Sequence, residues 1–154
     1  MAVRTSAGTT IGISSAAPAT FNSAGYTALT FTNIGEVTDL GEFGREYALV
    51  THNPVANRST VKRKGSYNEG AITLALGLDT DDAGQILLRT ASLSDSDYYF
   101  QITLQNGDKY FFPAQVMSFK IGVGGVDTIT AGTVTLEITS AGTAGVGVVE
   151  SLAA

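Results

Sequence analysis

The sequence contains no cysteine, no tryptophan and a single histidine in 154 residues. The lack of cysteine excludes disulfide bonds, thiolate zinc ligands and a thiol nucleophile. One histidine leaves little from which to build a metal centre or a catalytic triad. Charged residues are also scarce, at 15%, where a typical soluble protein has about 25%.

Long hydrophobic runs are missing too, although the mean hydropathy is positive, at +0.16. No stretch approaches the ~18 apolar residues of a membrane span, and residues 1–8 contain no apolar core of a secretory signal. We therefore expect no membrane span. An apolar, sparsely charged chain predicts that copies of the protein cover part of its surface. The length suits one domain with its own core.

Alternation of apolar with small or polar residues predicts a mainly β fold. In the range 71–78, for example, Ile72, Leu74 and Leu76 fall on one face of a strand. Asn106 and Gly107 predict a tight turn between two such strands, because both residues tolerate positive φ. The expected strands cover residues 26–32, 35–40, 45–51, 60–67, 71–78, 98–105, 109–121 and 128–139.

One helix is expected, over residues 80–92, where acidic residues precede an apolar stripe of helical spacing. The strands at 45–51 and 60–67 predict a long hairpin over residues 45–68. The chain ends are rich in Ala, Gly, Ser and Thr, and we expect residues 1–24 and 140–154 to be arms that flank a domain of residues 25–139.

Catalytic and metal-binding patterns are weak throughout the sequence. His52 begins an expected loop and has no nucleophile pattern near it. Residues 79–82 open like a calcium loop, but Ala83 and Thr90 stand where oxygen ligands are needed. The glycines at 122–125 lack the Lys-Ser/Thr of a phosphate loop. We therefore expect no enzymatic activity, no metal and no cofactor.

Basic residues are concentrated in the expected hairpin. Nine Lys and Arg residues are present, and four of them lie within seven positions: Arg58, Lys62, Arg63 and Lys64. The cluster is consistent with nucleic-acid binding, with a solvated hairpin, or with docking on an acidic patch of another copy. The overall pI of about 4.6 and the lack of a recognition motif argue against nucleic-acid binding. The apolar composition favours docking, so we expect these four residues at a subunit or ring interface.

The order of these patterns over residues 33–139 resembles the major tail tube protein of long, non-contractile-tailed bacteriophages (siphophages). The segments that carry the resemblance are residues 43–46, 62–76, 79–88, 99–104, 106–114, 116–119 and 133–139. The resemblance implies a β-sandwich with one packed helix, a long hairpin and extended termini. It also implies six subunits in a ring and rings stacked into a tail tube, through which phage DNA passes without specific binding.

Further expectations follow from this resemblance. The partners are other copies of the chain, a tape measure protein, and terminator or tip proteins; the location is the virion tail, after assembly in the host cytoplasm. Glu and Thr at outward strand positions suit a polar lumen wall that does not retain phosphate. The residues expected to face the lumen are Glu36, Glu46, Glu69, Thr133, Thr135 and Glu137.

Two alternatives belong to other classes. A tail terminator, adaptor or other ring protein of an injection system would share the fold but form single rings. A β-sandwich carbohydrate-binding module would need an exposed aromatic platform, for which Tyr98, Tyr99 and Tyr110 are the candidates.

Overall fold

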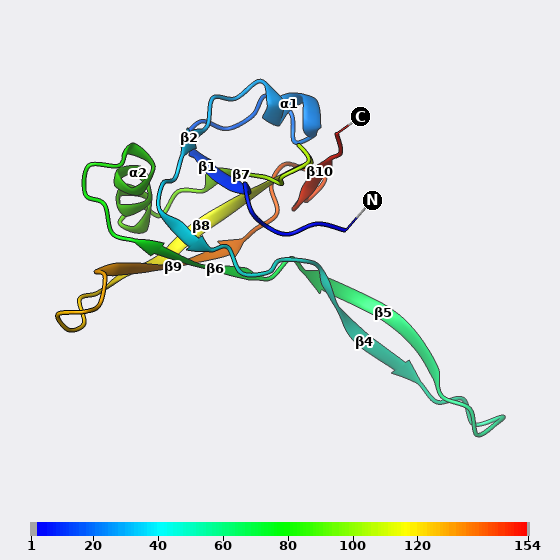
Figure 1. Cartoon of the computed structure of the whole chain (residues 1–154). Helices are drawn as coiled ribbons and strands as arrows, with labels where there is room; N and C mark the ends of the chain where they lie inside the picture. The colour runs from blue at the N-terminus through cyan, green and yellow to red at the C-terminus, as the bar shows by residue number, and fades with distance from the viewer. Residues whose placement is uncertain (1–2, 154) are drawn as a thin grey trace.

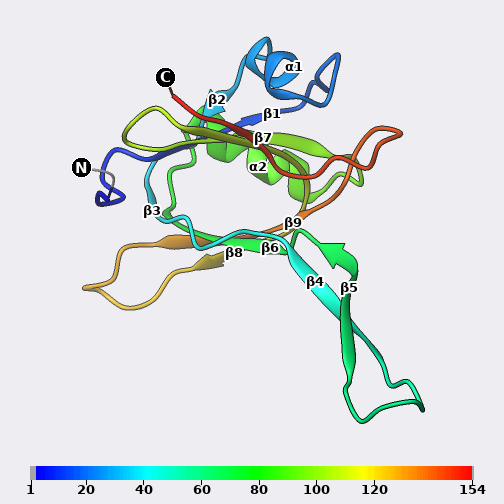
Figure 2. The same ribbon diagram turned by 90° about the vertical axis from the view of Figure 1, so that its right-hand side faces the viewer.

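Antiparallel strands make up most of the chain in the computed structural model, which describes residues 3–153. Two helices accompany them; Figure 1 labels the elements other than β3, which is labelled in Figure 2. The mainly β fold with a packed helix confirms the predicted fold class. In chain order the elements are β1 (Thr10–Ser14), α1 (Ser23–Thr27), β2 (Thr32–Asn33), β3 (Val37–Asp39), β4 (Glu46–His52), β5 (Val61–Asn68), β6 (Ala71–Gly77), α2 (Ala83–Ser92), β7 (Tyr98–Thr103), β8 (Lys109–Gly122), β9 (Ala131–Ile138) and β10 (Val149–Ser151).

Eight of the strands form a single sheet that curls over the core, as Figure 2 shows. Its order is β2-β1-β7-β8-β9-β6-β3, and β10 also pairs with β8. The 14-residue strand β8 belongs to both layers of this curl. Residues 109–114 pair with β7, and residues 114–122 pair with β9. A register shift between Val116 and Ser118 marks a bulge, which bends the strand between the layers.

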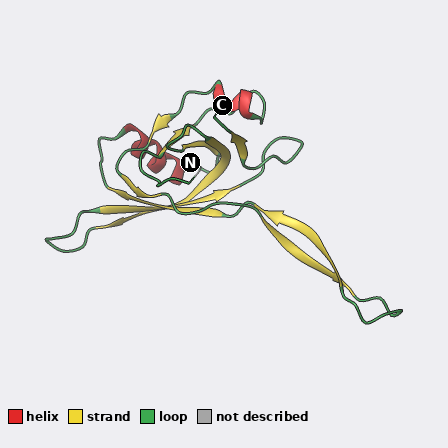
Figure 3. Cartoon of the chain, turned by 45° about the vertical axis from the view of Figure 1, so that its right-hand side comes forward, coloured by secondary structure: helices red, strands yellow, loops and turns green. Residues whose placement is uncertain are grey.

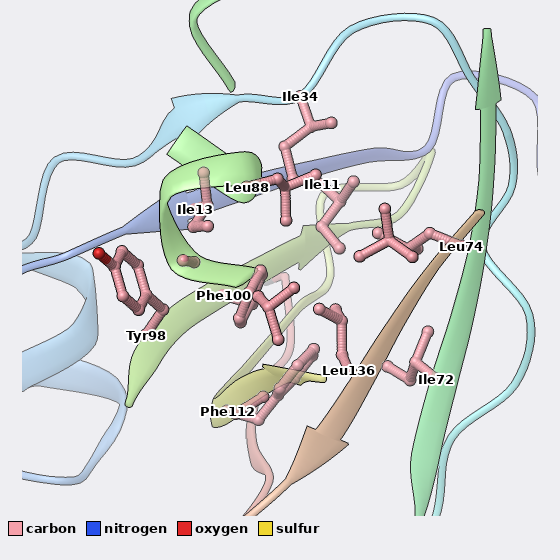
Figure 4. Packing of buried hydrophobic residues seen from close by; sticks show 14 of the residues in the cluster. Ile11, Ile13, Ile34, Ile72, Leu74, Leu88, Tyr98, Phe100, Phe112 and Leu136 are labelled. Atoms are coloured by element: carbon pink, nitrogen blue, oxygen red, sulfur yellow. The ribbon is translucent and has the colours of Figure 1, made fainter. Parts of the chain in front are cut away.

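The core lies between the two layers, and α2 packs against them (Figure 4). The apolar parity predicted for the range 71–78 is confirmed, because Ile72, Leu74 and Leu76 are all buried. The rings of Phe100 and Phe112 stack with centroids 5.5 Å apart. Burial of this apolar surface is the main term that stabilises the fold.

The N-terminal range 1–24, predicted as an arm, is part of the sheet and its flanks over the residues that the structure describes. Strand β1 lies between β2 and β7, with Ile11 and Ile13 fully buried. Gly12 interrupts the alternation of apolar and polar residues that would indicate a strand. Glycine is needed here because a Cβ at this position would lie 2.9 Å from the Cβ of Phe31. The strand predicted at 26–32 is also wrong in its first part, because Asn22 caps the short helix α1 by accepting a hydrogen bond from the Gly25 amide at 2.9 Å.

The C-terminal range 140–154, predicted as the second arm, is tied to the sheet over its described part. Strand β10 pairs with residues 109–111 of β8. The Ala153 amide donates a hydrogen bond of 2.8 Å to the carboxylate of Asp108, and this bond lowers the pKa of Asp108. These pairings are long-range contacts that composition alone does not indicate.

Helix α2 starts at a well-made cap. The Oδ2 atom of Asp82 accepts hydrogen bonds from the amides of Gln85 at 3.0 Å and Gly35 at 3.1 Å. We expect Asp82→Ala to lower the free energy of unfolding by about 1–2 kcal/mol, because it removes both bonds. Urea unfolding followed by circular dichroism measures this change. Asp82→Asn keeps an acceptor oxygen and should lose less; equal midpoints for Asp82→Ala and the native chain would contradict the prediction.

Candidate functional site

The β4–β5 hairpin leaves the domain and projects from one end of it (Figure 1). It is a separate two-stranded sheet, and every residue of β4 is exposed. Leu49 is 67% exposed, and Val50 and Val55 are also exposed. A two-stranded hairpin without a core is at best marginally stable in water, and exposed apolar residues mark an interaction surface. The hairpin is therefore suited to burial against a partner.

The four predicted interface residues all lie on this hairpin. Lys62 is opposite Thr51 and Lys64 is opposite Leu49, whereas Arg63 is opposite Val50. Lys62 and Lys64 consequently share one face of the ribbon, and Arg63 lies on the other. Arg58 lies in the tip. Within residues 3–153, none of these four cations forms an ion pair with a carboxylate.

The root of the hairpin is fixed by an arginine. Arg45 donates hydrogen bonds of 2.8 Å and 3.1 Å to Glu69 Oε1, and its guanidinium lies 3.9 Å from the ring centroid of Tyr67. Glu69 is only 6% exposed, and a Cβ at Gly147 would lie 2.6 Å from its Cγ. The alternation of residues in the sequence predicted that Glu69 would point outward onto an open polar face. In the structure its side chain is buried against Arg45 instead. Its place after a strand end allowed it to turn inward toward Arg45.

A hollow of about 760 Å³ lies beside this root. Its walls come from β4, β5, the end of β9 and the C-terminal segment that follows. Its lining residues include Glu46, Tyr47, Ala48, Ser66, Tyr67 and Ile138. The hollow opens to solvent at the same end of the domain as the hairpin.

Small polar residues cover the outer face of the second sheet layer. Thr133, Thr135 and Glu137 alternate with buried residues of β9 and so point outward together. Their cross-strand neighbours are also small or polar: Thr73 and Ala75 on β6, and Ser118 and Lys120 on β8. The structure thus brings three of the six predicted lumen residues together on one face.

The other three predicted lumen residues lie elsewhere. Glu36 is exposed just before β3, in a left-handed conformation with φ of 61°. Glu46 is on the hairpin, and Glu69 is at its root. Lys120, which sequence reasoning missed, lies directly opposite Thr133. The face therefore carries charges of both signs rather than a uniformly acidic surface. Lys120 could have been found from the sequence, because it is two residues from Ser118 and therefore points to the same side of β8.

A second projection lies at the opposite end of the domain (Figure 3). It is the connection between β8 and β9, residues 123–130, which we call the β8–β9 tip. Val126 is fully exposed, Ile129 is 82% exposed and Val123 is also exposed. Asp127 is the charged residue of the tip. Both ends of the molecule thus present apolar side chains to solvent.

The tyrosines considered for a carbohydrate platform and the single histidine do not form a site together. Tyr98 and Tyr99 are buried, and Tyr110 packs edge-on against Phe43, so these tyrosines do not form an exposed platform. His52 is exposed at the end of β4. Within residues 3–153, no helix has the length and apolar character needed to cross a membrane.

Comparison with known proteins identifies the fold. No family model and no curated protein matches the chain. A chain of the sheath/tube terminator of an extracellular contractile injection system (PVC, extended state) matches with a TM-score of 0.66 and 12% identity, over 94% of this chain and 93% of that one. A chain of the anti-feeding prophage baseplate, six-fold symmetrised, matches with a TM-score of 0.61 and 8% identity, over 84% and 87%. At these identities the likeness establishes a shared fold.

Proposed function

We propose that this chain is a structural subunit of a phage tail or tail-like injection particle, and that it assembles with copies of itself into rings around a channel. The observation that carries the proposal is the β4–β5 hairpin, which exposes apolar and unpaired basic residues. A second copy would bury the apolar residues and pair the cations. The fold shared with chains of two injection particles supports this choice of partner.

The finer proposal is a tail tube subunit. Exposed apolar residues lie at both ends of the molecule, on the hairpin and on the β8–β9 tip. Two different, complementary ends make a heterologous contact, which repeats without closing and so builds a stack of rings. The sequence resemblance favours hexameric rings in the tube of a long non-contractile tail, within the virion. Its partners are then the tape measure protein and the terminator and tip proteins.

A tail terminator is the second candidate function, and the likeness to a chain of a sheath/tube terminator favours it. A terminator would form one ring and bind a tube end through one face. In either case the chain has a structural and not a catalytic role. The outer face that carries Thr133, Thr135 and Glu137 lines the channel. Small polar side chains with mixed charge give DNA phosphates little to bind, because retention needs clustered positive charge.

Negative-stain electron microscopy of the purified chain tests the proposal. We expect tubes of uniform diameter, because subunits with two complementary ends stack without a template. Uniform single rings would identify the terminator alternative. Dispersed single subunits at high protein concentration would contradict self-assembly altogether, and sedimentation velocity of the same sample would detect that outcome.

A further inference from the structure

The two ends of the second sheet layer have complementary shapes. At one end the β8–β9 tip is a convex projection with Val123, Val126 and Ile129 exposed. At the other end, the hollow of about 760 Å³ lies at the root of the β4–β5 hairpin. Figures 1 and 3 show the two projections pointing away from each other along the layer.

We propose that the β8–β9 tip of one copy inserts into the hollow at the hairpin root of a second copy. This inference rests on the proposed self-assembly and adds the pair of surfaces that meet. The β4–β5 hairpin then lies along the outside of the copy whose tip it receives.

The direction of the strands supports this arrangement. Strand β6 begins beside the hairpin root and pairs along its full length with β9, which begins beside the tip: Ala71 is opposite Glu137, and Gly77 is opposite Ala131. The tip and the root hollow therefore lie at the two ends of one ladder. A copy displaced along the strand axis brings its tip to the hollow of its neighbour without a turn of the molecule.

The residues that line the hollow also suit the tip. Its lining includes the exposed aromatic residues Tyr47 and Tyr67 as well as Ala48 and Ser66, and a contact of this kind combines an apolar centre with a polar rim. The glycines at 124 and 125 keep the tip narrow, and Gly124 has a φ of +68°, which favours glycine.

Charge favours the same pairing. The tip brings one carboxylate, Asp127, to a hairpin with four cations that have no ion-pair partner in the described chain. Glu46 is the carboxylate in the lining that no ion pair neutralises, because Glu69 is paired with Arg45. The four cations lie farther along the hairpin, outside this lining. Because the hairpin runs along the copy whose tip it receives, the attraction for Asp127 comes from the hairpin and not from the lining of the hollow.

The absence of native cysteine from the sequence makes disulfide trapping a clean test. Val126→Cys is placed on the tip, and Ser66→Cys is placed in the hollow, in separate full-length chains. The two chains are mixed, allowed to assemble, oxidised and run on a non-reducing gel. Ala24→Cys, exposed on α1 on the far layer, replaces Ser66→Cys in the control mixture.

We expect the tip and hollow pair to give at least about tenfold more disulfide-linked dimer than the control pair, because a disulfide needs Cα atoms within about 7 Å. Microscopy of the same samples separates the two proposals. Assemblies without a tip–hollow product would overturn this inference and leave the proposed function standing. No assemblies from the cysteine variants or the native chain would overturn both.

Discussion

Replacing Lys62 and Lys64 with glutamate is expected to abolish assembly and leave the subunit folded. Both side chains are exposed, share one face of the hairpin and lack a carboxylate partner in the described chain. Lys64 Nζ lies 4.6 Å from the ring centroid of Tyr47, but no carboxylate within residues 3–153 neutralises either ammonium group, so both charges can pair with a neighbouring copy. In the proposed arrangement the hairpin lies along a copy whose tip carries Asp127. Reversal then sets like charges against each other, and such a mismatch costs several kcal/mol per interface. Because each subunit repeats the contact, the loss is multiplied along the assembly.

The measurement is the fraction of protein that sediments as assemblies, and we expect it to fall at least about tenfold, since every ~1.4 kcal/mol changes an association constant by that factor. Unfolding midpoints should remain near the native value, because exposed substitutions usually shift stability by within about 0.5 kcal/mol. The matched control, with arginine at both positions, keeps the charge and should assemble. Normal tubes from the glutamate variant would refute the role of these residues.

Replacing Gln85 with leucine is expected to cause the largest loss of stability. Gln85 is completely buried in α2. Its Nε2 donates hydrogen bonds to the carbonyls of Gly35 at 3.0 Å and Gly77 at 2.9 Å, and its Oε1 accepts one from the Asp79 amide at 3.0 Å. One side chain therefore joins the helix to the segment before β3 and to the end of β6.

Leucine has a similar size but leaves these backbone groups without a partner. Each unsatisfied buried group costs about 1–3 kcal/mol, so we expect a loss of at least about 3 kcal/mol in the free energy of unfolding. Denaturant unfolding at matched protein concentration measures the loss, because assembly also contributes to apparent stability. Gln105→Leu, at an exposed turn position, is the control and should change little. A similar midpoint for both variants would contradict the assigned role of Gln85.

The spacing of apolar and polar residues in the sequence predicted the buried faces of the central strands, helix α2 and the long hairpin. The alternation in β6 and β9 indicated which residues are buried, since one face of each strand meets the core. The acidic run at residues 79–82 and the apolar stripe after it indicated α2, which begins at Ala83 and not at residue 80 because Asp82 is the cap. The hairpin was predicted from two strand patterns around a polar tip. The place of its basic residues at an interface stays a prediction.

Tertiary contacts decided what the sequence did not reveal. Strand β1 is short and contains Gly12, so its pattern is weak until β2 and β7 are in place beside it. Glu69 was assigned an outward position by parity, but its ion pair with Arg45 depends on how the hairpin joins the sheet. Gln85 gave no signal at all, because the three groups that it contacts come from separate segments.

The pairing of β6 with β9 has a mechanical consequence. The hairpin enters the ladder through the start of β6, and the β8–β9 tip enters it through the start of β9, at the opposite end. Tension between the two projections would pull these antiparallel strands in opposite directions along their axes. Since the ladder bonds are perpendicular to the strands, all of them bear the load together in shear instead of opening one by one. A column of such subunits would resist stretching through its hydrogen-bond ladders as well as through its contacts.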